Sequence, residues 1–184
     1  MLKAITLSGS IRQNSHNGRL AQLMTAKLSA AGADVLPIDL GAFELPLFNA
    51  DLESELGQPE AAIILANHFA GSDMVFIASP EYNGSLSPLL KNTIDWISRQ
   101  KTTPFDNAVF GIGAASPGKM AGISGLGHLR DILGKLGALV APVTLGIGNA
   151  QSAFDQNGQL SNPAANRRAD LLVSQLMNIS HIPK

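Results

Sequence analysis

Side chains suited to holding a phosphate gather in one short stretch near the start of this 184-residue chain. A phosphate monoester carries about two negative charges near neutral pH, and proteins bind it with hydroxyls, cations and the free N–H groups at the start of a helix. An apolar strand pattern ends where the stretch begins, and a helical pattern starts where it ends. The sequence therefore predicts a phosphate site in a strand-to-helix loop. Its expected donors are Ser8, Ser10, Arg12, Ser15, His16 and Asn17, with Gly9 making the bend.

Arg12 carries most of this prediction. One charge-assisted hydrogen bond from its guanidinium group contributes about 1.5–3 kcal/mol, and a binding role is favoured for a cation inside such a loop. Ser15 and Asn17 are each explained equally well as turn and helix-cap residues. The loop lacks the G-x-G-x-x-G fingerprint, which disfavours a dinucleotide-binding domain. The histidines are dispersed without metal-ligand spacing, so no metal is expected.

A second stretch suits a flat ring better than a phosphate. Residues 80–85 read Pro-Glu-Tyr-Asn-Gly-Ser and follow the fully apolar run 74–78. Gly84 lets the backbone come close to a flat ligand, and Tyr82 offers an aromatic surface with a polar tip. Free backbone N–H groups there suit ring nitrogens and carbonyls. Glu81 fits a solvated loop carboxylate about as well as a direct ligand contact.

A third stretch, residues 113–119, is rich in glycine and small residues. It matches the first seven positions of a P-loop, but Met120 stands where a serine or threonine would hold magnesium. It also follows the fourth predicted strand instead of the first. Nucleotide hydrolysis is therefore rejected.

The pattern of the chain supplies a scaffold that can bring these stretches together. Short apolar runs alternate with helical patterns, which is typical of a doubly wound parallel sheet. Strands are predicted at residues 4–8, 35–39, 74–78, 108–112 and 139–143. Helices are predicted at residues 15–31, 59–70, 87–99, 124–136 and from 163 onward, the last with Leu171, Leu172, Gln175 and Leu176 on its inner face. Residues 40–57, which contain Pro46 and show no period, are predicted as a loop.

We expect one α/β domain over residues 1–184. Its predicted form is a flavodoxin-like three-layer α/β/α sandwich with a five-stranded parallel sheet in the order 2-1-3-4-5. Ligands of such sheets bind beyond the carboxyl ends of the strands, at the switch point between strands one and three. The loops that start near residues 8, 79 and 114 all begin at this edge, so the three stretches are expected to form one site.

Composition narrows the chemistry further. The chain has 45% hydrophobic and 15% charged residues, a net charge of −1 and no cysteine. Disulfides, thiolate-held iron–sulfur clusters and cysteine nucleophiles are excluded, so redox chemistry would need an organic cofactor or a metal. The lack of a basic run disfavours nucleic acid, and no apolar stretch approaches the roughly 20 residues that span a bilayer. Without a signal-peptide pattern, the cytoplasm is expected.

The chain resembles the NADPH-dependent FMN reductases, which include bacterial quinone, azo-dye and chromate reductases. The resemblance rests on Gly9-Ser10-Ile11-Arg12 with Ser15 and Asn17, and more specifically on Pro80 to Ser85 followed by Pro88, Leu90, Lys91, Asn92, Asp95 and Trp96. A looser segment covers residues 116–118 and 128–130, where Ala121-Gly122 departs from the expected glycine pair. Residues and resemblance together predict FMN contacts at Ser10, Arg12, Ser15, His16, Asn17, Pro80, Glu81, Tyr82, Asn83, Gly84, Ser116 and Gly118.

The resemblance implies an FMN-dependent NAD(P)H oxidoreductase. A hydride would pass from NADPH or NADH to flavin N5, and the electrons then to a second small-molecule acceptor, in a ping-pong cycle without a catalytic side chain. A homodimer or homotetramer is also implied, with Trp96 either in the core or at a subunit contact. A flavodoxin-like electron carrier, an FMN-binding sensor without reductase activity and a fold that has lost its cofactor stay open. The sequence offers no residue that distinguishes NADPH from NADH.

Overall fold

A parallel sheet of five strands forms the centre of the protein. The computed structural model describes residues 1–180, and the strands lie in the order β2-β1-β3-β6-β7. They are β1 (Lys3–Ser8), β2 (Asp34–Ile38), β3 (Met74–Ala78), β6 (Val109–Ala115) and β7 (Leu139–Ile147). Each neighbouring pair is parallel. The predicted order 2-1-3-4-5 of the main strands is therefore confirmed.

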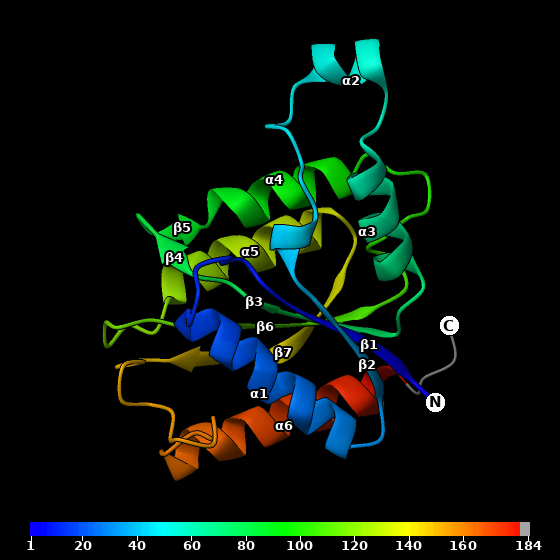
Figure 1. Ribbon diagram of the computed structural model, residues 1–184. Helices are drawn as coiled ribbons and strands as arrows, with labels where there is room; N and C mark the ends of the chain where they lie inside the picture. The colour runs from blue at the N-terminus through cyan, green and yellow to red at the C-terminus, as the bar shows by residue number, and fades with distance from the viewer. Residues whose placement is uncertain (181–184) are drawn as a thin grey trace.

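Helices cover both faces of the sheet (Figure 1). One face carries α1 (His16–Ala30) and α6 (Pro163–Ser180), and the other carries α3 (Glu60–Ala70), α4 (Pro88–Ile97) and α5 (Ile123–Lys135). Within residues 1–180, no helix is both long enough and apolar enough to cross a membrane. The layers form the predicted α/β/α sandwich.

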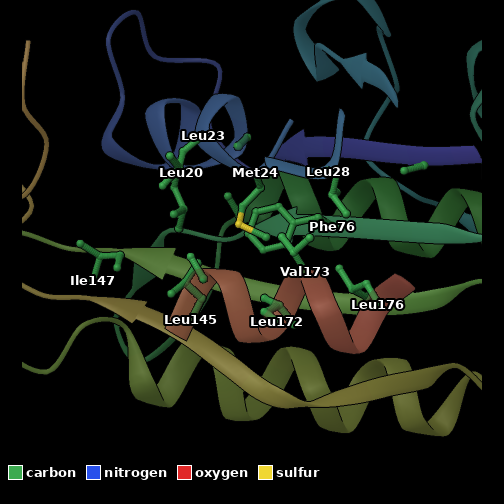
Figure 2. Close-up of a cluster of buried hydrophobic side chains, with 14 of the residues drawn as sticks. Leu20, Leu23, Met24, Leu28, Phe76, Leu145, Ile147, Leu172, Val173 and Leu176 are labelled. Atoms are coloured by element: carbon green, nitrogen blue, oxygen red, sulfur yellow. The ribbon is translucent and has the colours of Figure 1, made fainter. Parts of the chain in front are cut away.

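Two apolar cores hold the layers together. In the first, Leu20 and Met24 of α1 meet Phe76 of β3 and Leu172 and Leu176 of α6 (Figure 2). The second lies between the opposite face of the sheet and α3, α4 and α5. Because close-packed cores resist deformation, the sheet fixes where each strand ends and where the following loop begins.

The inner face of α6 differs in part from the prediction. Leu172 and Leu176 are buried, but Leu171 is 51% exposed. With 3.6 residues per turn, the neighbours 171 and 172 point in different directions, so the prediction of Leu171 is wrong. Gln175 is half-buried, and its side-chain oxygen accepts a hydrogen bond from the N–H of Val143 at 3.0 Å.

Residues 40–57 are not the plain loop that their lack of a period predicted. They contain a short 3-10 helix, η1 (Leu40–Ala42), and a helix, α2 (Ala50–Leu56), which buries none of its residues. The side chain of Asn49 caps α2, a local signal that starts a helix without any apolar period. In Figure 1, α2 projects beyond α4.

The stretch after β3 is a hairpin where a loop was expected. Its strands are β4 (Glu81–Tyr82) and β5 (Ser85–Leu86). Asn83 and Gly84 form the turn with φ of 51° and 78°. Two successive positive φ values define a type I′ turn, which asparagine followed by glycine favours. The turn itself thus requires Gly84, whatever lies beside it.

Trp96 belongs to the core. Its side chain is fully buried, and its ring N–H donates to the carbonyl oxygen of Pro46 at 2.7 Å. The ring of Phe48 packs edge-on against it, with the ring centroids 5.0 Å apart. A side chain enclosed in this way is not available for the subunit contact that the resemblance left open.

Candidate functional site

Three loops come together at the carboxyl edge of the sheet. The first loop (residues 8–15) is joined to β3 by the N–H of Gly9, which donates to the carbonyl of Ala78 at 2.9 Å. The hairpin follows β3, and the third loop (residues 116–122) follows β6, which pairs with β3. The stretches that carry the candidate residues are therefore neighbours in space, at the switch point where such sheets bind ligands.

The first loop leaves backbone donors free at the start of α1. Ser15 is the N-cap: its hydroxyl oxygen accepts from the N–H of Gly18 at 2.9 Å, and its own N–H donates to the carbonyl of Arg12 at 3.1 Å. The N–H groups of His16 and Asn17 have no acceptor within residues 1–180. Free amides at a helix N-terminus form an anion site, strengthened by the helix dipole.

A cavity of about 290 Å³ opens on this loop. Its lining includes Ser10, Arg12 and Ser15 from the predicted set, together with Arg19 and Asp39. Arg12 is exposed and forms no ion pair within the part of the chain that the structure describes. Its charge is thus available to a ligand in the cavity.

His16 adds a second sign of an anion site. Its Nδ1 atom is buried and has no hydrogen-bond partner in the described residues. Burial, reinforced by the positive charges of Arg12 and Arg19, holds the pKa of His16 below its ordinary value of 6.5. The same positive field that disfavours a protonated imidazole favours a phosphate.

Asn17 has a different role from the one predicted. Its side-chain N–H₂ donates to the carbonyl of Ala115 at 3.0 Å, and its side-chain oxygen accepts from the N–H of Ala115 at 2.9 Å. The amide proposed as a phosphate donor is therefore engaged in a clamp between α1 and the end of β6. Asn17 has only its backbone N–H to offer a ligand.

Ser87 forms a second clamp, between the first loop and α4. Its hydroxyl donates to the carbonyl of Gly9 at 2.6 Å and accepts from the N–H of Leu90 at 3.2 Å. A Cβ at Gly9 would lie 3.1 Å from both Leu90 Cβ and Ser87 Oγ. The sequence identified Ser87 only as the cap of a helix, because its partner Gly9 is distant in the chain.

Glu81 forms a third clamp, between the hairpin and α5. Its carboxylate accepts from the N–H of Gly125 at 2.8 Å, in the first turn of a helix whose own cap, Gly122, has no side chain. A Cβ at Gly125 would lie 3.1 Å from the carbonyl oxygen of Ser85, so glycine permits the close approach. Glu81 is thus neither a freely solvated carboxylate nor free for a ligand.

Of the other predicted ring contacts, Pro80 is buried, whereas Tyr82, Asn83, Gly84, Ser116 and Gly118 are exposed or partly exposed at the same edge. Tyr82 is 51% exposed, and Asn83 beside it in the turn is also exposed. In the third loop the hydroxyl oxygen of Ser116 accepts from the N–H of Gly118 at 3.2 Å. The hairpin and the third loop can therefore provide an aromatic surface and backbone groups to a flat ring.

The third loop ends in two left-handed residues. Ala121 has φ of 55° and Gly122 has φ of 72°. Glycine adopts such values freely, whereas alanine pays about 1–2 kcal/mol. A Cβ at Gly122 would lie 2.7 Å from that of Ala114, which explains why this member of the expected glycine pair is kept while Ala121 departs from it.

Taken together, the edge offers an anion cavity at one end and ring-sized surfaces at the other. Among the described residues, no group of three His, Asp or Glu side chains lies close enough to hold a metal ion.

Known proteins are similar to this chain in sequence and in fold. The family model described as NADPH-dependent FMN reductase matches residues 2–152. A quinone reductase of Escherichia coli K12 is 37% identical over 139 residues, which are 76% of this chain and 73% of that protein. An NAD(P)H-dependent FMN reductase of Pseudomonas aeruginosa is 34% identical over 170 residues, 89% of this chain and 87% of that protein.

The fold is shared with a solved flavoenzyme. FerB, an NAD(P)H:(acceptor) oxidoreductase of Paracoccus denitrificans, superposes with a TM-score of 0.80 and is 23% identical. The superposition covers 97% of this chain and 98% of FerB.

Proposed function

Because the chain belongs to the NADPH-dependent FMN reductase family and is an NAD(P)H-dependent flavin oxidoreductase, we propose that it reduces quinones in a ping-pong cycle. The overall reaction converts NAD(P)H, one proton and a quinone into NAD(P)⁺ and the hydroquinone. When bound, FMN supplies the acceptor for the hydride, at its N5 atom, and the donor of the same two electrons to the quinone. The relatives named for quinone reduction support the choice of acceptor.

The residues of the first loop fit the phosphate of FMN, and this observation carries the proposal. The buried Nδ1 of His16 lacks a partner, the N–H groups of His16 and Asn17 are free, and Arg12 has no carboxylate partner within residues 1–180. In the protein alone each of these groups lacks a hydrogen-bond or ionic partner, and a dianionic phosphate would supply one. Ser10, Arg12 and Ser15 line the cavity of the first loop, and His16 and Asn17 follow it in the first turn of α1 without lining it.

The hairpin and the third loop are proposed to hold the ring. Pro80, Glu81, Tyr82, Asn83 and Gly84 would present their backbone and the exposed ring of Tyr82 to it. From the opposite side, Ser116 and Gly118 would close on it. Glu81 anchors the hairpin to α5, and Asn17 anchors the end of β6, from which the third loop starts. We assign no side chain to proton abstraction.

The test is a spectrum of the purified protein. FMN-type absorption bands that bleach on anaerobic addition of NADPH or NADH, and return on addition of benzoquinone, support the proposal; initial-rate plots with parallel lines support the ping-pong order. Flavin that neither nucleotide bleaches would make the protein an electron carrier or a sensor. Colourless protein without a melting shift on FMN addition would mean that the fold has lost its cofactor.

Assembly is part of the proposal. By the family relation we propose a homodimer or homotetramer in the cytoplasm. Light scattering behind gel filtration measures the first, and a monomer at micromolar concentration would contradict it. Fractionation of the source cells measures the second.

A further inference from the structure

A second cavity lies on the far side of the third loop, toward β7. Its volume is about 460 Å³, and its lining includes Met120, Ile123, Leu126, Arg130, Thr144 and Arg168. It shares no residue with the cavity of the first loop. Met120 belongs to the third loop itself, so this loop borders both the new cavity and the proposed ring site.

Two arginines in this cavity are positioned by neutral groups. Arg130 donates to the carbonyl of Ala141 and to the hydroxyl of Thr144, both at 2.9 Å. Arg168 donates through Nε to the carbonyl of Thr144 at 2.6 Å. Neither arginine forms an ion pair within residues 1–180, and no carboxylate is part of the cavity lining. The two guanidinium groups are therefore held by β7 with their charges uncompensated.

Arg168 has more N–H donors than its hydrogen bond to the protein uses. A guanidinium group has five N–H donors in a planar fork, and the hydrogen bond to Thr144 uses only Nε. Within residues 1–180 neither Nη group of Arg168 has an acceptor, and the side chain is exposed at the cavity. A fork of this kind matches a phosphate monoester with two parallel hydrogen bonds.

Apolar side chains stand at the mouth of the same cavity. Met120 is 71% exposed and Ile123 is 61% exposed, and both line this cavity, so they form an apolar surface there. A flat aromatic ring would cover them and remove that surface from water. The cavity therefore combines a phosphate-binding fork with a surface for an aromatic base.

We propose that this cavity binds the adenosine 2′-phosphate of NADPH, and that Arg168, supported by Arg130, makes the protein prefer NADPH to NADH. The inference rests on the proposed function, because the nicotinamide end must reach the ring site across the third loop. The 2′-phosphate is the one chemical difference between the two nucleotides. The arginines of the first loop are not alternatives, since they face the cavity proposed for the phosphate of FMN.

Binding of nucleotide fragments tests the proposal without turnover. Adenosine 2′,5′-bisphosphate and 5′-AMP are titrated into the FMN-loaded protein by calorimetry. Arg168→Ala should weaken the bisphosphate at least tenfold, the loss expected for one charge-assisted hydrogen bond, and leave 5′-AMP unchanged. Arg167→Ala is the matched control, because Arg167 is the exposed neighbour on α6 that does not line the cavity.

Kinetics provide the second readout. In Arg168→Ala, kcat/KM for NADPH should fall about tenfold while kcat/KM for NADH stays within twofold. Equal losses for both nucleotides, or no change in either, overturn the inference, and flavin bleaching by NADH would still uphold the proposed function. A changed KM for an anionic quinone sulfonate with unchanged NADPH kinetics also overturns it, because the cavity would then serve the acceptor. Arg130→Lys, which keeps the charge, should retain more of the NADPH preference than Arg130→Ala.

Discussion

Arg12 is expected to contribute to FMN binding and not to the stability of the apoprotein. It is exposed and has no ion pair within residues 1–180, so Arg12→Ala should leave the melting temperature of the apoprotein nearly unchanged. FMN affinity should fall at least tenfold, consistent with about 1.5–3 kcal/mol for a charge-assisted hydrogen bond. Quenching of FMN fluorescence measures the affinity, and differential scanning fluorimetry measures the melting temperature.

Arg19 offers the contrasting control for Arg12. Its guanidinium group lies 4.7 Å from the centroid of the Phe154 ring and donates to the carbonyls of Phe154 and Asp155. Arg19→Ala should therefore destabilise the apoprotein itself. If Arg12→Ala destabilises the apoprotein as much as Arg19→Ala does, Arg12 is structural and the phosphate assignment fails.

His16 predicts a pH dependence with a definite sign. Its folded pKa lies below 6.5 because of burial and the charges of Arg12 and Arg19. As the pH falls from 6.5 to the folded pKa, the unfolded chain therefore binds more protons at this position than the folded chain. Stability does not depend on His16 above pH 6.5 and decreases as the pH falls through this window. His16→Asn should flatten the decline of apoprotein stability between pH 7.5 and 5.5, measured by urea unfolding. Parallel declines in the two proteins would contradict this.

The hairpin and α5 behave as one unit at the scale of elements, because Glu81 joins them. Glu81→Ala leaves the N–H of Gly125 without its acceptor, and loss of a helix cap typically costs about 0.5–2 kcal/mol. It should also weaken FMN binding several-fold and shift the visible bands of bound flavin, since the ring wall loses its anchor. Glu81→Gln keeps an acceptor oxygen and should restore most of both properties.

A control on another helix separates this effect from a general loss of acidic charge. Glu55 is an exposed carboxylate on α2, which buries none of its residues. Glu55→Ala should change neither the flavin spectrum nor the stability. If Glu81→Gln is as defective as Glu81→Ala, the negative charge of Glu81 acts on the ring directly, and its role as a positioning residue fails.

The elements also show what a sequence can and cannot reveal. Apolar runs such as residues 74–78 predict buried strands because a central parallel strand has no polar face. The helix α2 was missed because its signals are confined to its ends, with a cap at Asn49, acidic residues in the first turn and Gly57 at the C-cap, and no apolar period runs between them. The clamp between Asn17 and Ala115 was missed because it joins residues 98 positions apart, and no local pattern encodes such a contact. The sequence identifies the hydrogen-bond donors of the first loop, but it does not reveal the protein groups to which some of them are already bonded.

At the scale of the whole molecule, three clamps join the segments around the candidate site. Ser87 fixes the first loop to α4, Asn17 fixes α1 to the end of β6, and Glu81 fixes the hairpin to α5. Each clamp is a hydrogen bond between two segments that are distant in the sequence. A ligand that spans all three loops therefore adds to constraints that already exist in the protein alone, and the loops should respond to it together.

Removal of FMN should test this coupling. A ligand at about 100 times its Kd stabilises the folded protein by roughly 2.7 kcal/mol, so the apoprotein should melt several degrees lower. Hydrogen exchange should quicken in residues 8–17, 80–86 and 116–122 together, while the amides of β3 stay protected. Asn17→Ala breaks the link to Ala115 and should make exchange in the first and third loops respond to FMN to different degrees. A uniform change across the whole sheet would mean that FMN stabilises the fold only globally and that the clamps do not couple the loops.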